Sequence, residues 1–374
     1  MINSSLENII CIENRVLSLK VNILTTNNFI SYYFFYPLLA NKRRLRELNI
    51  ILKYYEKVRE SIYDCDVLLL DSKYFANLWS NREYVIALLQ KIKEKCAKVI
   101  WLDSTASTGT THFQVMPFVD RYWKKQLLKD LSLYENKFYG ERIYTDYYKH
   151  YLNIDNESTY TVEPLKEDVK CKVDLSWNLG LGPHSTNIRI SNLMRLTPWN
   201  IKKKFNLKYK LNFHLPSNER AYSICFRGTM KYSKQALSFQ RIKIIEKLKL
   251  RGIETEPFSY RKYLKEIKES LIAVSPFGYG EICYRDFEII LAGALLFKPS
   301  MEHLKTYPDI YVKNKTYVPF EWDFSDFDEK LDILLNDRNQ IHRIIHEVHE
   351  KYIHYTSNDS QEGFCNRFKN ILLN

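Results

Sequence analysis

The 374-residue sequence contains no apolar run of the roughly 18 to 20 residues that a membrane-spanning helix needs. Its first residues are acidic where a secretory signal would place positive charge before an apolar core. The seven cysteines are scattered and odd in number, and none lies close to another in the sequence, so neither a disulfide framework nor a zinc site is indicated. These absences predict a cytoplasmic protein, which would meet a membrane only from its inner face.

The composition is that of a folded protein, with 45% hydrophobic and 27% charged residues. A chain of 374 residues is longer than one typical core requires, so two domains are expected. The net charge of +12 predicts attraction to anions, which include nucleotide phosphates, acidic lipid headgroups and nucleic acid. The basic, aromatic stretch 29–55 is compatible with peripheral contact with an anionic membrane, or with a partly buried helix that ends in solvated basic residues.

Short apolar runs alternate with helical patterns in both halves of the chain. The first half has expected strands at 17–24, 65–72 and 97–104, with helices over 42–60 and 80–96 between them. The second half repeats this order. Its expected strands are 221–228, 252–258, 271–278, 294–299 and 316–322, and its expected helices are 233–250, 260–270, 281–294, 325–335, 338–354 and 360–373.

This alternation of strands and helices predicts an α/β fold with two Rossmann-like domains that face a central cleft. The expected N-terminal, acceptor-side domain covers 1–205 and the C-terminal, nucleotide-sugar-binding domain covers 206–355. The segment 356–374 is expected to form a C-terminal helix that crosses back to the first domain.

A glycine-containing turn joins the strand that ends at Ser275 to a helix expected from about Glu281. Gly278 and Gly280 have no Cβ, so the backbone there can adopt positive φ and a ligand can approach closely. The N–H groups of the helix N-terminus suit a phosphate or a sugar hydroxyl. Glu281, Arg285 and Glu288 are spaced to share one helical face, which forms either a ligand site or a solvated salt-bridge ladder.

Basic residues follow another expected strand, at Arg227 and Lys231. Such side chains at a strand end can neutralise a diphosphate, although similar basic loops also occur as plain surface.

The order of these motifs resembles the donor-binding domain of GT-B glycosyltransferases of the exostosin-like and group 1 types. The segment R-x-x-E-x-x-x-x-G of that family is matched by Arg285, Glu288 and Gly293. The resemblance implies that Glu288 binds the ribose of a nucleotide sugar and that neighbouring basic residues bind its diphosphate. The implied donor-binding set is Arg227, Lys231, Ser275, Gly278, Tyr279, Gly280, Glu281, Arg285 and Glu288. Many group 1 enzymes have a glutamate just before the FG turn, whereas this chain has Ser275 and Pro276.

An inverting transfer needs a base on the first domain to take a proton from the acceptor hydroxyl. Asp103, at the end of an expected strand, and His112, in the polar loop after it, are the leading candidates, followed by Asp71 and His184. The alternative for Asp103 is that it caps a turn with Ser104 and Thr105.

Three histidines at helical spacing, His342, His346 and His349, do not form the H-E-x-x-H zinc pattern, so an exposed helix without metal is expected. The resemblance likewise implies no metal and no cofactor, the nucleotide sugar being a co-substrate. The function expected from these observations is glycosyl transfer to a glycan or lipid-linked acceptor, in the synthesis of polysaccharide, lipopolysaccharide or another glycoconjugate. No nucleic-acid partner is expected, and the alternative is a basic, non-catalytic nucleic-acid-binding protein.

Overall fold

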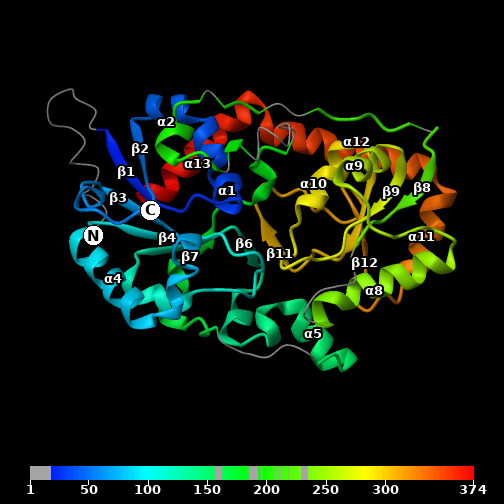
Figure 1. Cartoon of the computed structure of the whole chain (residues 1–374), viewed down its shortest axis with the longest axis horizontal. Helices are drawn as coiled ribbons and strands as arrows, with labels where there is room; N and C mark the ends of the chain where they lie inside the picture. Colours follow the sequence, from blue (N-terminus) through cyan, green and yellow to red (C-terminus); the bar gives the residue numbers. More distant parts are fainter. Residues whose placement is uncertain are drawn as a thin grey trace.

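The computed structural model describes residues 18–155, 162–184, 193–194, 196–205, 207–209, 212–217, 219–228 and 235–374. Figure 1 shows two α/β units side by side, the first half of the chain forming one and most of the second half the other. Within the described residues, no helix is both long and apolar enough to cross a bilayer.

The first unit is built on a six-stranded sheet in which all neighbouring strands are parallel. In spatial order its strands are β2 (Ile50–Tyr55), β1 (Leu19–Leu24), β3 (Val67–Asp71), β4 (Val99–Asp103), β5 (Arg121–Lys124) and β7 (Val173–Leu175). Every residue of β3 and β4 is buried, as expected for central strands covered on both faces. The helices of this unit are α1 (Phe29–Ala40), α2 (Lys42–Glu47), α3 (Ser72–Phe75), α4 (Arg82–Lys95) and α7 (Trp199–Lys202). The helix α5 (Ile143–Leu152) also comes from the first half of the chain but lies against the second unit, where the Tyr148 ring packs against Phe239 (Figure 1).

The helix expected over 42–60 is wrong, because α2 ends at Glu47 and the chain then enters β2. Asn49 lies between them with φ 59, a left-handed conformation that asparagine adopts more readily than most residues. β2 pairs with β1, which satisfies its backbone groups in the sheet.

The aromatic part of the stretch 29–55 lies in the core. Tyr32, Phe34 and Phe35 on α1 are at most 1% exposed. The rings of Phe34 and Trp177 stack with their centroids 4.9 Å apart. These side chains are therefore occupied by protein packing and do not form a surface for lipid.

The second unit has a four-stranded parallel sheet in the order β12 (Val318–Phe320), β10 (Leu295–Pro299), β9 (Ser270–Val274) and β8 (Tyr222–Cys225). Its helices are α8 (Gln235–Leu250), α9 (Tyr260–Lys268), α10 (Tyr284–Leu291), α11 (Phe327–Asn336) and α12 (Arg338–Thr356). The strand expected over 252–258 is wrong, since this segment is irregular. Pro257 in it has no N–H to donate to a ladder, and β8 is left as the edge strand.

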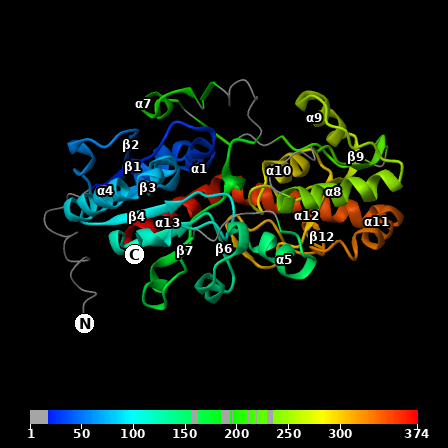
Figure 2. The ribbon, with the colours of Figure 1, turned by 60° about the horizontal axis from the view of Figure 1, so that its bottom comes forward.

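Two further features join the units. β6 (Gln126–Leu128) of the first pairs antiparallel with β11 (Leu304–Thr306) of the second. After α12 the chain enters α13 (Asn358–Leu373), whose Phe364 and Phe368 rings pack against Trp177 of the first unit. Figure 2 shows α13 lying among elements of the first unit.

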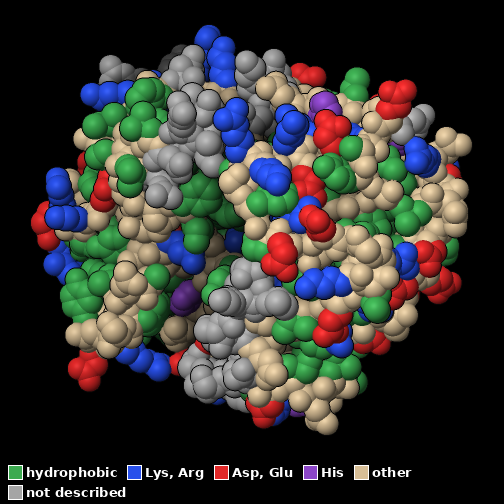
Figure 3. All heavy atoms as spheres, turned by 45° about the vertical axis from the view of Figure 1, so that its right-hand side comes forward, with side chains coloured by type: hydrophobic (Ala, Val, Ile, Leu, Met, Phe, Trp, Pro, Cys, Tyr) green, Lys and Arg blue, Asp and Glu red, His purple; other side chains and the backbone are tan. Residues whose placement is uncertain are grey.

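The expectation of two Rossmann-like domains is confirmed by these two parallel sheets and their helices. Figure 3 shows the surface hollowed between the domains, with basic and histidine side chains in the hollow.

Candidate active site

Two aspartates end neighbouring strands of the first sheet. Asp71 is buried and accepts hydrogen bonds from the hydroxyl groups of Thr25, Ser31 and Ser104, at 2.6 to 2.9 Å. It also caps α3 by accepting from the backbone N–H of Lys73 at 3.1 Å. Burial raises the pKa of Asp71, which these hydrogen bonds oppose. Asp71 thus holds together the polar ends of β3, β4 and α1.

Asp103 forms a denser cluster at the end of β4. Its carboxylate pairs with the buried ammonium of Lys124 at 3.0 Å and accepts from Tyr122 and from the N–H and hydroxyl of Thr105. Burial disfavours the charged form, but Lys124 and the hydrogen bonds outweigh burial and hold the pKa of Asp103 well below its usual value. A carboxylate so stabilised is a weak base, and its bonds to Thr105 match the turn-capping alternative. The catalytic role of Asp103 stays a prediction.

His112 lies beside this cluster, and its backbone N–H donates to the hydroxyl of Tyr122 at 2.9 Å. Its Nδ1 atom is 3.9 Å from Oδ2 of Asp103 and has no hydrogen-bond partner within the described part of the chain. The imidazole stacks against the indole of Trp79, with centroids 5.9 Å apart. The structure therefore places His112 near Asp103, as expected, but with an unused ring nitrogen.

Lys125 is a candidate functional residue that could not be identified from the sequence. It follows β5, is 3% exposed and makes no ion pair with a carboxylate in the described ranges. Burial, followed by repulsion from Lys73 and Lys124, lowers the pKa of Lys125 to about 7. The pair of adjacent lysines, Lys124 and Lys125, is visible in the sequence. However, β5 is only four residues long and has no apolar run, so the sequence does not show that these lysines lie at the end of a strand.

Lys125→Met is expected to raise the free energy of unfolding by about 1 to 2 kcal/mol at pH 6. Because the folded pKa of Lys125 lies near 7, below the unfolded value of 10.5, the penalty for burying its charge is complete below pH 7 and is relieved as the pH rises. The advantage of the variant in urea denaturation should therefore shrink between pH 7 and about 10. A constant difference across this range would contradict the assignment.

The polar groups of the loop 275–283 are mostly hydrogen-bonded to other parts of the protein. Ser275 is buried and donates its hydroxyl to Asp286 at 2.5 Å. The helix starts at Tyr284 rather than near Glu281, with Asp286 accepting from the backbone N–H of Cys283 in a capping arrangement. Glu281 therefore precedes the helix, and the expected polar face shared by Glu281, Arg285 and Glu288 is wrong.

Glu281 instead links the two domains. Its carboxylate is 0% exposed and accepts from the hydroxyls of Ser107 and Thr108, the N–H of Thr108 and the amide of Gln126, at 2.6 to 3.4 Å. All of these donors belong to the first domain. Glu281 is thus occupied at the domain interface, where no ligand reaches it.

The glycines of this loop serve a similar contact. Neither Gly278 nor Gly280 is among the residues with positive φ, so the left-handed conformation open to glycine is not used at either position. A Cβ on Gly280 would lie 1.8 Å from the carbonyl oxygen of Ala106, which shows that the close approach is to the first domain. The carbonyl of Gly278 accepts from Tyr144 at 2.6 Å. Tyr279, between them, is 54% exposed.

Gly280→Ala is expected to lower the free energy of unfolding by about 1 to 3 kcal/mol, because the added methyl overlaps the backbone at Ala106. Gly278→Ala is the matched control, since a Cβ there would meet nothing closer than 3.4 Å. Thermal unfolding of both variants measures the effect. Equal loss of stability in the two would contradict the close contact.

Of the charged side chains expected at the donor site, Arg285 and Glu288 on α10 are half-buried, and Tyr260 on α9 lies beside Glu288. Glu288 accepts a hydrogen bond from the hydroxyl of Tyr260 at 2.6 Å. Burial raises the pKa of Glu288, while bonds to Tyr260 and Tyr263 and the charge of Arg285 oppose the rise. Arg285 lies one turn before Glu288 and donates to the carbonyl of Arg227 at 2.7 Å. The structure thus brings Arg285, Glu288 and Arg227 together, as the sequence motifs predict.

Arg227 is largely committed to the protein. Its guanidinium pairs with Glu266 at 2.9 to 3.0 Å and lies over the ring of Phe258, 4.3 Å from the centroid. Lys231, the other expected diphosphate ligand, lies outside the described residues. The position of Arg227 near Arg285 agrees with the motif, but its charge is already compensated.

Aromatic residues of the first domain pack against α10. Tyr33 on α1 packs edge-on against Tyr284, with centroids 4.9 Å apart. His184 stacks on Phe287 at 4.3 Å, and its Nε2 contacts the carbonyl of Leu179 at 2.5 Å. Burial lowers the pKa of His184 to about 4, so the imidazole is neutral near pH 7. A neutral histidine beside the helix that carries Glu288 was among the weaker candidates from the sequence.

The three-histidine helix forms no metal site among the described residues. The expectation that it is exposed is wrong for His349, which is 6% exposed and contacts the carbonyl of Ile290 at 2.7 Å through Nε2. His346 is exposed and lies 3.6 Å from Glu350.

No protein-family model matches the sequence, and no curated protein matches it. Solved structures to which the chain is similar include an alpha-glucosyltransferase in complex with UDP and a 13-mer DNA, at 11% identity, covering 95% of this chain and 99% of that one, with a TM-score of 0.41. An alpha1,3-fucosyltransferase with GDP is 12% identical, covers 98% and 93%, and has a TM-score of 0.43. HepE of Anabaena, with UDP and glucose, is 7% identical, covers 95% and 99%, and has a TM-score of 0.44. At these values no residue-by-residue correspondence follows.

Proposed function

We propose that this protein is a glycosyltransferase of GT-B architecture that moves a sugar from a nucleotide-sugar donor to a glycan or lipid-linked acceptor. The observation that carries the proposal is Glu288, a half-buried carboxylate on α10 that lies beside Arg285 and already accepts a hydroxyl hydrogen bond from Tyr260. A carboxylate in this setting can accept from two neighbouring ribose hydroxyls. Aromatic rings of the first domain pack against Tyr284 and Phe287 of the same helix and would help to exclude water from the bound donor.

In the proposed reaction an acceptor oxygen forms a bond to the anomeric carbon while the bond from that carbon to the nucleotide diphosphate breaks. The acceptor proton passes to a base of the first domain, for which Asp103 and His112 remain the predicted residues. Positive charge at Arg285 and Lys231 would stabilise the departing diphosphate, with Arg227, already paired with Glu266, holding Arg285 through its carbonyl. The reaction is proposed to need no metal and no further cofactor, and to take place in the cytoplasm, at the inner face of the membrane for a lipid-linked acceptor.

Thermal shift with nucleotides and an oligonucleotide tests the proposal. UDP, GDP or CMP should raise the melting temperature, because a ligand that binds only the folded state stabilises it by mass action. Stabilisation by the oligonucleotide alone would favour the alternative of a basic nucleic-acid-binding protein. Hydrolysis of a panel of nucleotide sugars then identifies the donor, and turnover of none of them would contradict the proposal.

A further inference from the structure

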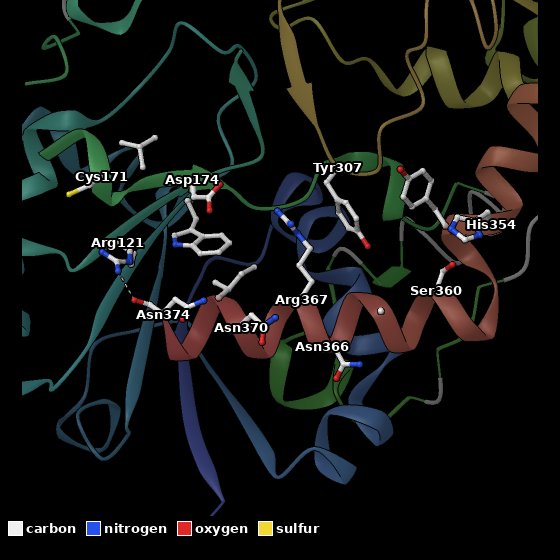
Figure 4. Close-up of a pocket in the computed structure, with 15 residues that line it drawn as sticks. Arg121, Cys171, Asp174, Tyr307, His354, Ser360, Asn366, Arg367, Asn370 and Asn374 are labelled. Carbon is white, nitrogen blue, oxygen red and sulfur yellow. Dashed lines mark hydrogen bonds between the residues drawn. The ribbon is translucent and has the colours of Figure 1, made fainter. Parts of the chain in front are cut away.

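A second cavity lies away from the loop 275–283, where the two domains and the C-terminal helix meet. Its volume is about 720 Å³. We call it the α13 groove. Its walls come from β5, the edge strand β7, the segment after β11, and the helices α12 and α13. The residues that line it include Trp123, Asp174, Tyr307, Asn366, Arg367 and Asn370. Figure 4 shows Arg367 extending from α13 toward Tyr307, with His354 and Ser360 near one end of the groove and Arg121 and Asn374 at the other.

The α13 wall of the groove carries uncharged polar side chains beside Arg367 and Ile371. Ser360, Gly363, Asn366, Asn370 and Asn374 all line it, and their spacing of three or four residues places them on one helical face. Asn366 and Asn370 are exposed, and their side-chain amides make no hydrogen bond within the described ranges. Each amide offers two donors and one acceptor oxygen to a ligand.

The opposite walls are aromatic. Tyr307 and Tyr355 pack edge-on with centroids 5.6 Å apart, and the guanidinium of Arg367 lies 4.7 Å from the centroid of Tyr307. Trp123 lines the groove while only 6% exposed; its indole N–H and Nε of Arg367 are both buried and have no acceptor among the described residues. The half-buried rings of Tyr307 and Tyr355 are therefore the aromatic surface that the groove offers to a ligand.

The charges of the groove do not suit an anion. Arg121 donates to the carbonyl of Asn374 at 2.7 Å, and Arg367 donates to the carbonyls of Leu175 and Ser176. Both guanidinium groups are therefore partly used, and Asp174 adds an exposed carboxylate. A phosphate-rich ligand needs several free cations, which this arrangement does not provide.

We propose that the α13 groove binds an uncharged oligosaccharide. Amide groups pair with adjacent sugar hydroxyls, and the rings of tyrosines such as Tyr307 and Tyr355 pack against the apolar faces of sugar rings, so this combination fits a saccharide better than a lipid or a nucleotide. The lining positions 360 to 374 extend about 21 Å along the helix, which accommodates several sugar units in a row. That the bound glycan is the growing acceptor rests on the proposed function, whereas the binding itself does not.

The test is a glycan array of neutral and acidic oligosaccharides, followed by calorimetric titration of the full chain with the glycans that bind. The double variant Asn366→Ala/Asn370→Ala removes the free amides, and Asn339→Ala, an exposed asparagine on α12 outside the groove, is the matched control. Neutral oligosaccharides should bind wild type and control alike, and at least tenfold more weakly to the double variant.

Failure to bind any neutral oligosaccharide, or equal affinity in the double variant, overturns the inference. Binding of acidic glycans alone overturns it too, because the groove would then be acting through its arginines. If donors are turned over but no glycan binds, this inference alone fails. If a neutral glycan binds at the groove but no donor is turned over, the proposed function fails and the groove assignment stands.

Discussion

Glu288→Ala is expected to lower kcat/KM for the nucleotide-sugar donor by about 100-fold or more, which corresponds to about 2.7 kcal/mol of lost transition-state stabilisation. The physical reason is the loss of a carboxylate that would accept two ribose hydroxyls, since hydrogen bonds to a charged group each contribute about 1.5 to 3 kcal/mol. Most of the change should fall on the KM for the donor, because the contact is to the nucleoside and not to the reacting atoms. Initial-rate kinetics with varied donor measure it.

The control for Glu288 is Glu329→Ala, an exposed glutamate on α11 that should leave the kinetics unchanged. Tyr260→Phe is informative as well, because it removes the hydroxyl that Glu288 accepts while retaining the ring. Its effect should be smaller than that of Glu288→Ala. If Glu288→Ala retains wild-type kinetics with a folded structure, the donor site assigned to α10 is wrong.

Asp103→Asn is expected to lower the free energy of unfolding by about 3 to 5 kcal/mol, because it leaves the fully buried ammonium of Lys124 without a counter-charge. Tyr122 and Lys124 donate to Oδ2 whereas Thr105 donates to Oδ1, so the single amide oxygen retains only one of these sets and the loss reports on the ion pair together with a hydrogen bond. Because the folded pKa of Asp103 is depressed below its unfolded value near 4, the stability that it contributes is present above about pH 4 and is lost as the pH falls.

The double variant Asp103→Asn/Lys124→Met distinguishes a structural from a catalytic aspartate. Removing both charges should recover about half of the lost stability, since no unpaired charge remains in the interior. Urea denaturation of wild type, single and double variants provides the comparison. An Asp103→Asn protein that keeps its stability but loses turnover would instead support the catalytic assignment.

The central strands and most helices could be predicted from the sequence. β3, β4, β9 and β10 are continuous apolar runs because parallel strands buried on both faces admit little else. β5 was not predicted, because its four residues include Arg121 and Lys124, and the burial of that lysine depends on Asp103 in the neighbouring strand.

For the candidate site, the sequence by itself determined which residue types follow the second-domain strands, and hence the grouping of Arg227, Arg285 and Glu288. It could not determine that Glu281 and Gly280 face the first domain, because their partners at Thr108 and Ala106 lie more than 170 positions away along the chain. The local sequence pattern shows which residues share a helical face or follow a strand. Whether such a side chain binds a ligand or contacts the other domain depends on what packs against it. Only the tertiary structure brings those surfaces together.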